Sequence, residues 1–163
     1  MGIIYDEQGN IVEGVVVKYY TGDKKMSETP YKNGKINGDV IEYHYNGLVS
    51  SRTPYVDGVV HGIEKIYYQT GMIMEVIPYE NGKINGIKYR YYETGLVEEE
   101  TEYVRDVING FVTKYNSDGT IKSKQEYKKG FPIDNVQEVN NVEDEKEEEK
   151  PDLLSQEELY RLL

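Results

Sequence analysis

The sequence predicts an all-β protein built as an elongated single antiparallel sheet of about five tandem 24-residue β-hairpin repeats. Two tyrosine ladders and one glycine ladder predict this fold, because all three keep the same 24-residue period and stay in register. Their members are Tyr19, Tyr43, Tyr67, Tyr91 and Tyr115; Tyr31, Tyr55, Tyr79, Tyr103 and Tyr127; and Gly14, Gly38, Gly62, Gly86 and Gly110. Repetition at this period indicates a solenoid-like architecture in which neighbouring units share one core.

Each repeat is predicted to be one β-hairpin. In the third repeat, residues 62–68 form the first strand, a short turn ends at Gly71, and residues 72–79 form the second strand. Residues 80–85 connect this unit to the next one. The second repeat carries Asn46-Gly47 in its turn, which is the strongest short hairpin signal. Later repeats have longer turns that end at a glycine, which favours a type I turn followed by a left-handed residue.

Strict alternation along each strand predicts which residues share a face of the sheet. By this rule Tyr67 and Ile63 share one face of the first strand, and Ile73 and Tyr79 share one face of the second strand. Both tyrosine ladders are therefore expected on one apolar, aromatic face, and charged residues on the other. Each connector adds one apolar residue to this pattern. These residues are Val12, Ile36, Val60, Ile84 and Ile108.

A single repeat is too small to fold alone. Burying an apolar side chain contributes about 1.5–3 kcal/mol, and a repeat offers only four or five of them. Ordering the backbone costs about 1–2 kcal/mol per residue. Stacked neighbours must therefore complete one another's apolar face, and terminal units are expected to be atypical.

The chain divides into four segments. Residues 1–13 are expected to form an N-terminal cap or a partial hairpin, and residues 14–133 form the repeat domain. Residues 134–150 are expected to be an acidic disordered linker, because they are too charged to bury a core. Residues 151–163 are expected to form a short amphipathic helix.

The predicted helix has its own start signal. Ser155 and Glu158 are spaced as a capping box, and Leu159, Leu162 and Leu163 follow as an apolar stripe. A helix this short is marginal alone in water, so we expect it to dock on a surface. The surface is either its own sheet or a groove of another protein, and the sequence favours the two equally.

Charge and composition exclude several classes of partner. The net charge is −11, and residues 134–163 supply most of it, with 11 acidic and 3 basic residues. Nucleic acids and anionic lipids need clustered Lys and Arg, so a nucleic-acid partner is not expected and a membrane partner is disfavoured. The chain has no cysteine and no apolar run long enough to span a membrane. Its start lacks a signal peptide, which predicts a cytoplasmic protein as the chain stands; export with a removed signal peptide stays open.

No catalytic, cofactor-binding or metal-binding residue is predicted. His44 and His61 are the only histidines, and no carboxylate cluster recurs beside either at metal-ligand spacing. The glycine-rich segment 34–38 lacks the end of a phosphate-binding loop and recurs at 82–86, so it is a repeat connector. No small-molecule substrate is evident, and we do not expect an enzyme.

Three further tyrosines are the best candidates for contact within the repeats. Tyr20, Tyr68 and Tyr92 each follow a member of the first ladder, so alternation points them to the opposite face. Aromatic residues exposed in a row are typical interface anchors. The predicted partner-binding residues are therefore these three tyrosines together with Leu159, Leu162 and Leu163. The alternative is that the tyrosines only support the sheet.

Two kinds of stretch recur in the repeats. They are Pro30-Tyr31-Lys32-Asn33-Gly34-Lys35-Ile36-Asn37-Gly38 with its counterpart at 78–86, and the Tyr-Tyr-x-Thr-Gly segments at 67–71 and 91–95. With these stretches the repeat resembles the MORN repeat family, and more closely its shortened variant. The same variant marks bacterial proteins classed as YwqK-type antitoxins of toxin–antitoxin systems. This resemblance implies a non-catalytic scaffold that mediates protein–protein interaction, with an antitoxin-like or immunity-like role and a toxin as partner. The alternative it implies is a lipid- or membrane-associated MORN scaffold.

Overall fold

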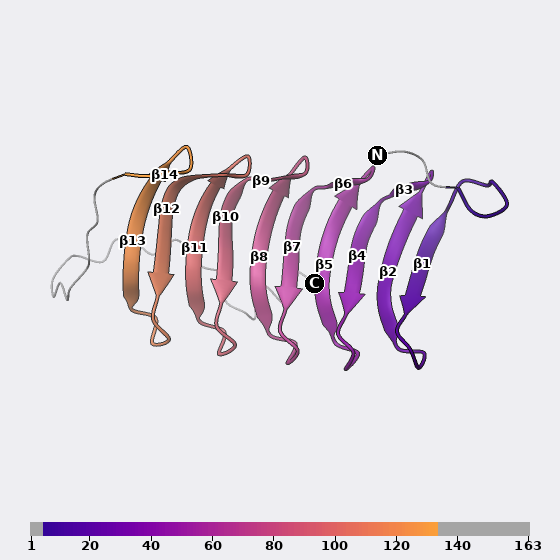
Figure 1. Cartoon of the computed structure of the whole chain (residues 1–163), viewed down its shortest axis with the longest axis horizontal. Helices are drawn as coiled ribbons and strands as arrows, with labels where there is room; N and C mark the ends of the chain where they lie inside the picture. The colour runs from indigo at the N-terminus through magenta and orange to yellow at the C-terminus, as the bar shows by residue number, and fades with distance from the viewer. Residues whose placement is uncertain (1–4, 134–163) are drawn as a thin grey trace.

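The computed structural model describes residues 5–133, which form one open, 14-stranded antiparallel sheet (Figure 1). This part of the chain contains no helix. The predicted all-β fold and the tandem hairpins are thereby confirmed. The predicted linker at 134–150 and helix at 151–163, with Leu159, Leu162 and Leu163, lie outside the described residues.

Five long hairpins lie side by side along the sheet (Figure 1). Their strands are β1 (Gly14–Tyr19) and β2 (Lys25–Lys32), β4 (Gly38–Tyr43) and β5 (Val49–Val56), β7 (Gly62–Tyr67) and β8 (Ile73–Glu80), β10 (Gly86–Tyr91) and β11 (Val97–Val104), and β12 (Val107–Tyr115) and β13 (Ile121–Lys128). The short strands β3 (Lys35–Ile36), β6 (Val59–Val60), β9 (Lys83–Ile84) and β14 (Phe131–Pro132) belong to the connectors. Before β1, an isolated bridge joins Tyr5 to Ile11.

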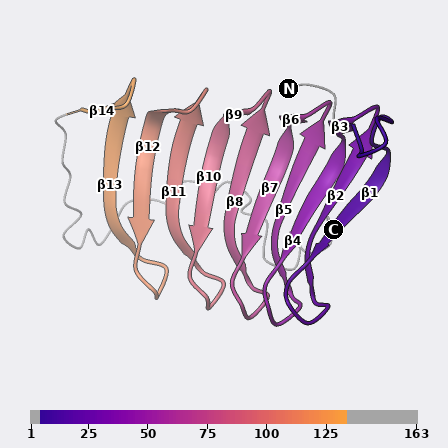
Figure 2. The same ribbon diagram turned by 45° about the vertical axis from the view of Figure 1, so that its right-hand side comes forward.

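The long strands stay in one layer when the molecule is turned (Figure 2). Strands at the β1 end are tilted relative to those at the β13 end, as the twist of an open sheet requires. A single layer has two faces, and the residues on each face decide what the protein can bind.

All five hairpins contain a β-bulge beside the turn. In the third repeat, Tyr67 pairs with Ile73 whereas Ile66 pairs with Glu75, so Met74 is an extra residue in the second strand. Because one extra residue reverses the alternation, Ile73 lies on the face of Tyr67, and Tyr79 lies on the opposite face. The expectation that both tyrosine ladders share one face is therefore wrong.

We call the face that carries Tyr67 and Ile73 face A, and the face that carries Glu64 and Tyr79 face B. Strand register places Val76 and Tyr89 on face A, since Val76 pairs with both Lys65 and Tyr89. Each face thus receives one of the two tyrosine ladders.

The best-buried apolar cluster lies at the centre of face A. Tyr67, Ile73, Val76 and Tyr91 form it, and Val49, Tyr89 and Val97 pack against it. Ile73 is 0% and Tyr91 5% exposed, whereas Tyr19 is 55% and Ile121 44% exposed at the two ends of the sheet. Terminal repeats have one neighbour fewer, so the ends are less protected than the centre.

The turn of the second repeat does not differ from that of the third. The Gly47 N–H donates to the His44 carbonyl at 2.9 Å, as the Gly71 N–H donates to the Tyr68 carbonyl at 2.9 Å. Gly47 has φ of 91° and Gly71 has φ of 89°, so both occupy a left-handed position. Asn46-Gly47 therefore does not form a two-residue turn; its glycine closes a longer one.

The connectors contain the two-residue turns. Asn81 and Gly82 have φ of 51° and 80°, the two positive values of a type I′ turn. Arg105 and Asp106 adopt the same conformation, with φ of 51° and 71°, although neither is glycine or asparagine. A left-handed arginine is unfavourable because its Cβ approaches the backbone.

Replacing Arg105 by Asn should stabilise the protein, because Asn tolerates the left-handed conformation better. We expect Arg105→Asn to raise the free energy of unfolding by about 1 kcal/mol, measured by urea denaturation followed by circular dichroism. Lys128→Asn, at the exposed end of β13, is the control and should give no gain. A destabilised Arg105→Asn variant would contradict this account of the turn.

Candidate functional site

The residue that follows each tyrosine of the first ladder is hydrogen-bonded to the next hairpin in four of the repeats. The Tyr68 hydroxyl donates to the Tyr91 carbonyl at 2.6 Å, and the Tyr92 hydroxyl donates to the Tyr115 carbonyl at 2.8 Å. Tyr20 makes the same bond to the Tyr43 carbonyl at 2.8 Å. In the second repeat, His44 takes this place, and its Nε2–H donates to the Tyr67 carbonyl at 2.9 Å. This hydrogen-bond ladder therefore crosses the four successive boundaries between neighbouring hairpins, which we call seams.

The structure leaves Tyr20, Tyr68 and Tyr92 half-buried. Their hydroxyls are engaged within the chain, so only their rings remain for contact with another molecule. Burial raises the pKa of the Tyr68 phenol, and the nearby carboxylate of Glu98 adds to this effect. Partner contact through these rings stays a prediction.

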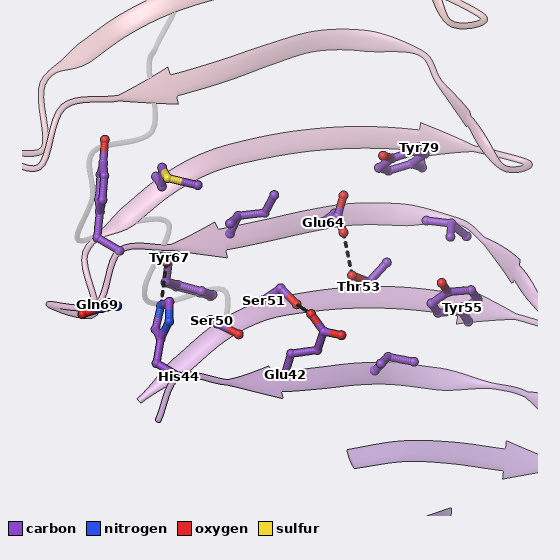
Figure 3. A pocket seen from close by; sticks show the side chains of 15 residues that line it. Glu42, His44, Ser50, Ser51, Thr53, Tyr55, Glu64, Tyr67, Gln69 and Tyr79 are labelled. Atoms are coloured by element: carbon purple, nitrogen blue, oxygen red, sulfur yellow. Dashed lines mark hydrogen bonds between the residues drawn. The ribbon is translucent and has the colours of Figure 1, made fainter. Parts of the chain in front are cut away.

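Tyr68 also lines a groove of about 730 Å³ on face B (Figure 3). The groove runs across β4, β5, β7 and β8, so it is built from two successive repeats. Its lining includes Val40, Glu42, His44, Ser51, Thr53, Tyr55, Glu64, Ile66, Tyr68, Met74 and Tyr79. No Lys or Arg is among its lining residues, so the groove presents negative charge.

Two carboxylates stand in the groove and are held by hydroxyl groups (Figure 3). The Ser51 hydroxyl donates to Glu42 at 3.1 Å, and the Thr53 hydroxyl donates to Glu64 at 2.6 Å. Each bond joins neighbouring strands, because Glu42 is on β4, Ser51 and Thr53 are on β5, and Glu64 is on β7. The hydroxyls fix the carboxylates without neutralising them, so both charges are available to a cationic ligand.

Tyr55 and Tyr79 complete the groove. Burial raises the pKa of Tyr79 to about 12, and the charge of Glu64 is the second cause. Burial likewise raises the pKa of Tyr55, with help from Glu64 and Glu42. Both phenols therefore stay neutral at physiological pH and offer aromatic ring surface beside negative charge.

Cationic residues follow the groove along face B. Glu75 on β8 forms ion pairs with Lys88 at 2.9 Å and with Arg90 at 3.1 Å, both on β10. The next long hairpin places Lys114 3.5 Å from Glu99. Face B thus changes from acidic to mixed charge between the second and fourth repeats.

Sequence reasoning missed the groove because alternation assigned Tyr55 and Tyr79 to the same face as Tyr67. One signal could have revealed the error. Glu75 has the same parity as Ile73 and Tyr79, so an acidic residue falls within a series that was read as apolar. A break of this kind indicates a bulge or a change of face.

His61, the second histidine, supports a connector turn. The His61 ring accepts a hydrogen bond at Nδ1 from the Asn81 N–H at 3.3 Å. Asn85 and Asn109 accept the equivalent bonds from Arg105 and Lys129, each at 3.2 Å.

Across residues 5–133, no group of three or more His, Asp or Glu side chains could hold a metal ion. In the same range, no helix is long and apolar enough to cross a membrane.

The ladder bond of Tyr68 can be tested by removing its hydroxyl. Tyr68→Phe keeps the ring and should lower the free energy of unfolding by about 0.5–1.5 kcal/mol. Urea denaturation measures the change, and Tyr5→Phe, an exposed tyrosine before β1, is the matched control. Equal stability of Tyr68→Phe and the unchanged protein would show that the bond does not couple the repeats.

Alkaline pH should destabilise the fold through Tyr79. Its phenol has a raised pKa of about 12 against a reference value of 10.0, so the folded state holds its proton longer than the unfolded state does. The resulting stability is complete below pH 10 and is lost as pH rises toward 12. We expect the urea midpoint to fall over this range, and to fall less steeply in Tyr79→Phe. Identical slopes in both proteins would contradict the assignment.

Comparison with known proteins gives a partial match. A family model described as MORN repeat variant matches residues 12–33 and 60–81. No curated protein matches the chain. Among solved structures, "Crystal structure of accessory secretory protein 1,2 and 3 in Streptococcus pneumoniae" is 18% identical, with a TM-score of 0.39. That similarity covers 69% of this chain and 20% of the other, so the chain spans about a fifth of the length of that structure's chain. The first and third long hairpins are thus the parts of the chain that match the MORN repeat variant.

Proposed function

We propose that the chain is a non-catalytic repeat module that binds another protein through the groove on face B. The observation that carries this proposal is the composition of the groove, in which Glu42 and Glu64 stand between tyrosines with no lining Lys or Arg. Tyrosine is enriched at protein interfaces because it combines a large ring with a polar tip. MORN repeats generally serve as binding modules, and two segments match that model.

The groove chemistry defines the kind of segment that fits. A Lys or Arg side chain can pair with Glu42 or Glu64 while its apolar stem packs on Tyr55 or Tyr79. The groove crosses four strands and is open along face B, so it suits an extended segment. The proposed partner therefore presents a basic, extended segment.

The finer form of the proposal is an antitoxin-like or immunity-like role. The resemblance to the YwqK-type antitoxins supports it, because a basic segment of a toxin could be covered by the acidic groove. In this form the chain inhibits the toxin by occupying that segment.

A charge-reversal experiment tests the proposal. The purified full chain serves as bait in a lysate of its source organism. A Glu42→Lys, Glu64→Lys double variant is used as bait in a parallel experiment. Captured proteins are identified by mass spectrometry, and each candidate is then purified and titrated by calorimetry. We expect a stoichiometric partner that the double variant no longer binds, with an affinity that weakens as salt is raised.

The matched control is a Glu102→Lys, Glu126→Lys double variant, which makes the same charge change on face A. It should retain the partner. Equal capture by both variants, or the absence of a stoichiometric partner, would count against the groove. Salt-sensitive sedimentation of the chain with anionic vesicles would favour the lipid-binding alternative instead.

A further inference from the structure

The two ends of the sheet are edge strands of different character. Strand order places β1 at one end, and β13 with the short β14 at the other (Figure 1). An edge strand presents unpaired backbone groups to which another strand can be added, and proteins commonly protect such edges with lysine, proline or very short strands. The composition of each end strand therefore indicates which edge is protected and which is open to pairing.

The β13 edge is protected. The strand carries Lys122 and Lys124 on its exposed half, and the two-residue strand β14 contains a proline. The hydrogen-bond ladder also stops here. Asn116 stands at the place of Tyr92, and its side-chain amide donates to the Thr120 hydroxyl of its own turn at 3.0 Å. This edge therefore does not offer a further hairpin the bond that crosses the other seams.

The β1 edge lacks this protection. Its sequence, Gly14-Val15-Val16-Val17-Lys18-Tyr19, contains three successive valines and one charged residue. Val15 is 59%, Val16 38% and Tyr19 55% exposed, although β-branched and aromatic residues favour packed strands. Within residues 5–133, β1 pairs with β2 alone. An apolar edge of this kind favours the addition of another strand.

Alternate residues of β1 direct their backbone groups away from β2. The Tyr20 N–H donates to the Lys24 carbonyl inside the first hairpin at 2.8 Å. Alternation therefore turns the groups of Val15, Val17 and Tyr19 outward. The later hairpins support this assignment, because the carbonyl at the place of Tyr19 accepts a bond from the preceding hairpin in each of them. Three residues of β1 thus offer an N–H and a carbonyl to a neighbouring strand.

This pattern is complementary to itself. When two copies of β1 run antiparallel about a two-fold axis at Val17, Val17 pairs with its own counterpart and Val15 pairs with Tyr19 of the second copy. Strand register places these three residues on face A, so Val15 and Tyr19 of the two copies cover each other there. Lys18 lies opposite Val16 of the second copy, so no like charges are directly paired. An interface in which the same patch serves both copies closes at the dimer.

Charge at the two ends of β1 favours the antiparallel pair. Residues 5–13 carry three acidic and no basic residues, whereas residues 18–25 carry three lysines and one aspartate. The acidic segment is held at the start of β1, because the Val12 carbonyl accepts the Gly34 N–H at 3.0 Å. Lys25 pairs with Glu28 in its own hairpin, so the remaining two lysines supply the attraction. Two antiparallel copies bring the acidic segment of each beside these lysines of the other.

We propose that the β1 edges of two copies pair antiparallel, with a two-fold axis at Val17, to form a dimer with one continuous sheet. The axis is perpendicular to the sheet, so face A continues into face A and the two face B grooves open on the same side. The groove lies on β4, β5, β7 and β8, which this pairing does not touch. The dimer is therefore independent of the function proposed for face B.

Sedimentation velocity of the purified full chain tests the dimer. We expect a species of twice the monomer mass of 18.9 kDa that dissociates on dilution. Val17→Lys places two like charges opposite each other at the axis, so this variant should be monomeric. Ile121→Lys, on β13 at the other end of the sheet, adds the same charge and should remain dimeric. Circular dichroism checks that both variants keep the sheet.

Cysteine cross-linking tests the register with a smaller change. The sequence has no cysteine, so Val17→Cys places one thiol of each copy at the axis. Directly paired residues of this kind have Cα atoms about 5.5 Å apart, a separation that a disulfide spans. We expect diamide, which oxidises two thiols to a disulfide, to convert Val17→Cys into a covalent dimer. Val16→Cys, whose thiol lies opposite Lys18 on face B, is the matched control and should cross-link much less.

Several outcomes would overturn the proposal. A chain that is monomeric at every concentration, a dimer that survives Val17→Lys, and cross-linking of Val16→Cys in preference to Val17→Cys each contradict it. Species larger than a dimer that Ile121→Lys abolishes would indicate head-to-tail pairing of β1 with β13. A monomer that loses a binding partner in Val17→Lys would assign the edge to a segment of another protein. Glu42→Lys with Glu64→Lys should leave the dimer unchanged, so failure of the groove and failure of the edge are distinguishable.

Discussion

Neighbouring hairpins of this sheet share few backbone pairs, and their coupling depends on hydrogen bonds at both ends of each seam. Strands β5 and β7 have two register pairs, whereas the strands within the third hairpin have six. At one end of that seam, the Gly82 N–H donates to the Val60 carbonyl at 2.8 Å, and at the other end His44 donates to the Tyr67 carbonyl at 2.9 Å. Since a single hairpin is marginal in water, these bonds make the array cooperative.

The bulge in every hairpin gives the repeat two different surfaces. One extra residue near the turn places the apolar end of the second strand with the first tyrosine ladder, on face A. Beyond the bulge the alternation is reversed, so Tyr55 or Tyr79 points to the other side and joins polar residues on face B. Without the bulge, strict alternation would put both ladders on one side and leave no aromatic residue for the acidic groove.

Binding specificity can then vary without a change in the backbone. Equivalent positions at the end of the first strand hold Glu42, Ile66, Arg90 and Lys114 in successive repeats. The sheet keeps its register through all of them, because these side chains point away from the face A cluster. Face B can therefore be acidic at this position in the second repeat and basic in the fourth, and the proposed groove lies where the acidic positions meet two tyrosines.

The sequence alone determined the repeat period, the hairpins and the positions of the connectors, because each depends on local chemistry. Glycine at a left-handed position and an alternating strand can both be read within one repeat. The tertiary structure decided which residues share a face and which residues meet. The bulge reverses alternation at a place that no single residue marks, and Tyr68 finds its acceptor 23 residues away, in the next repeat. The groove likewise joins side chains from four strands, so it exists only once two repeats have stacked.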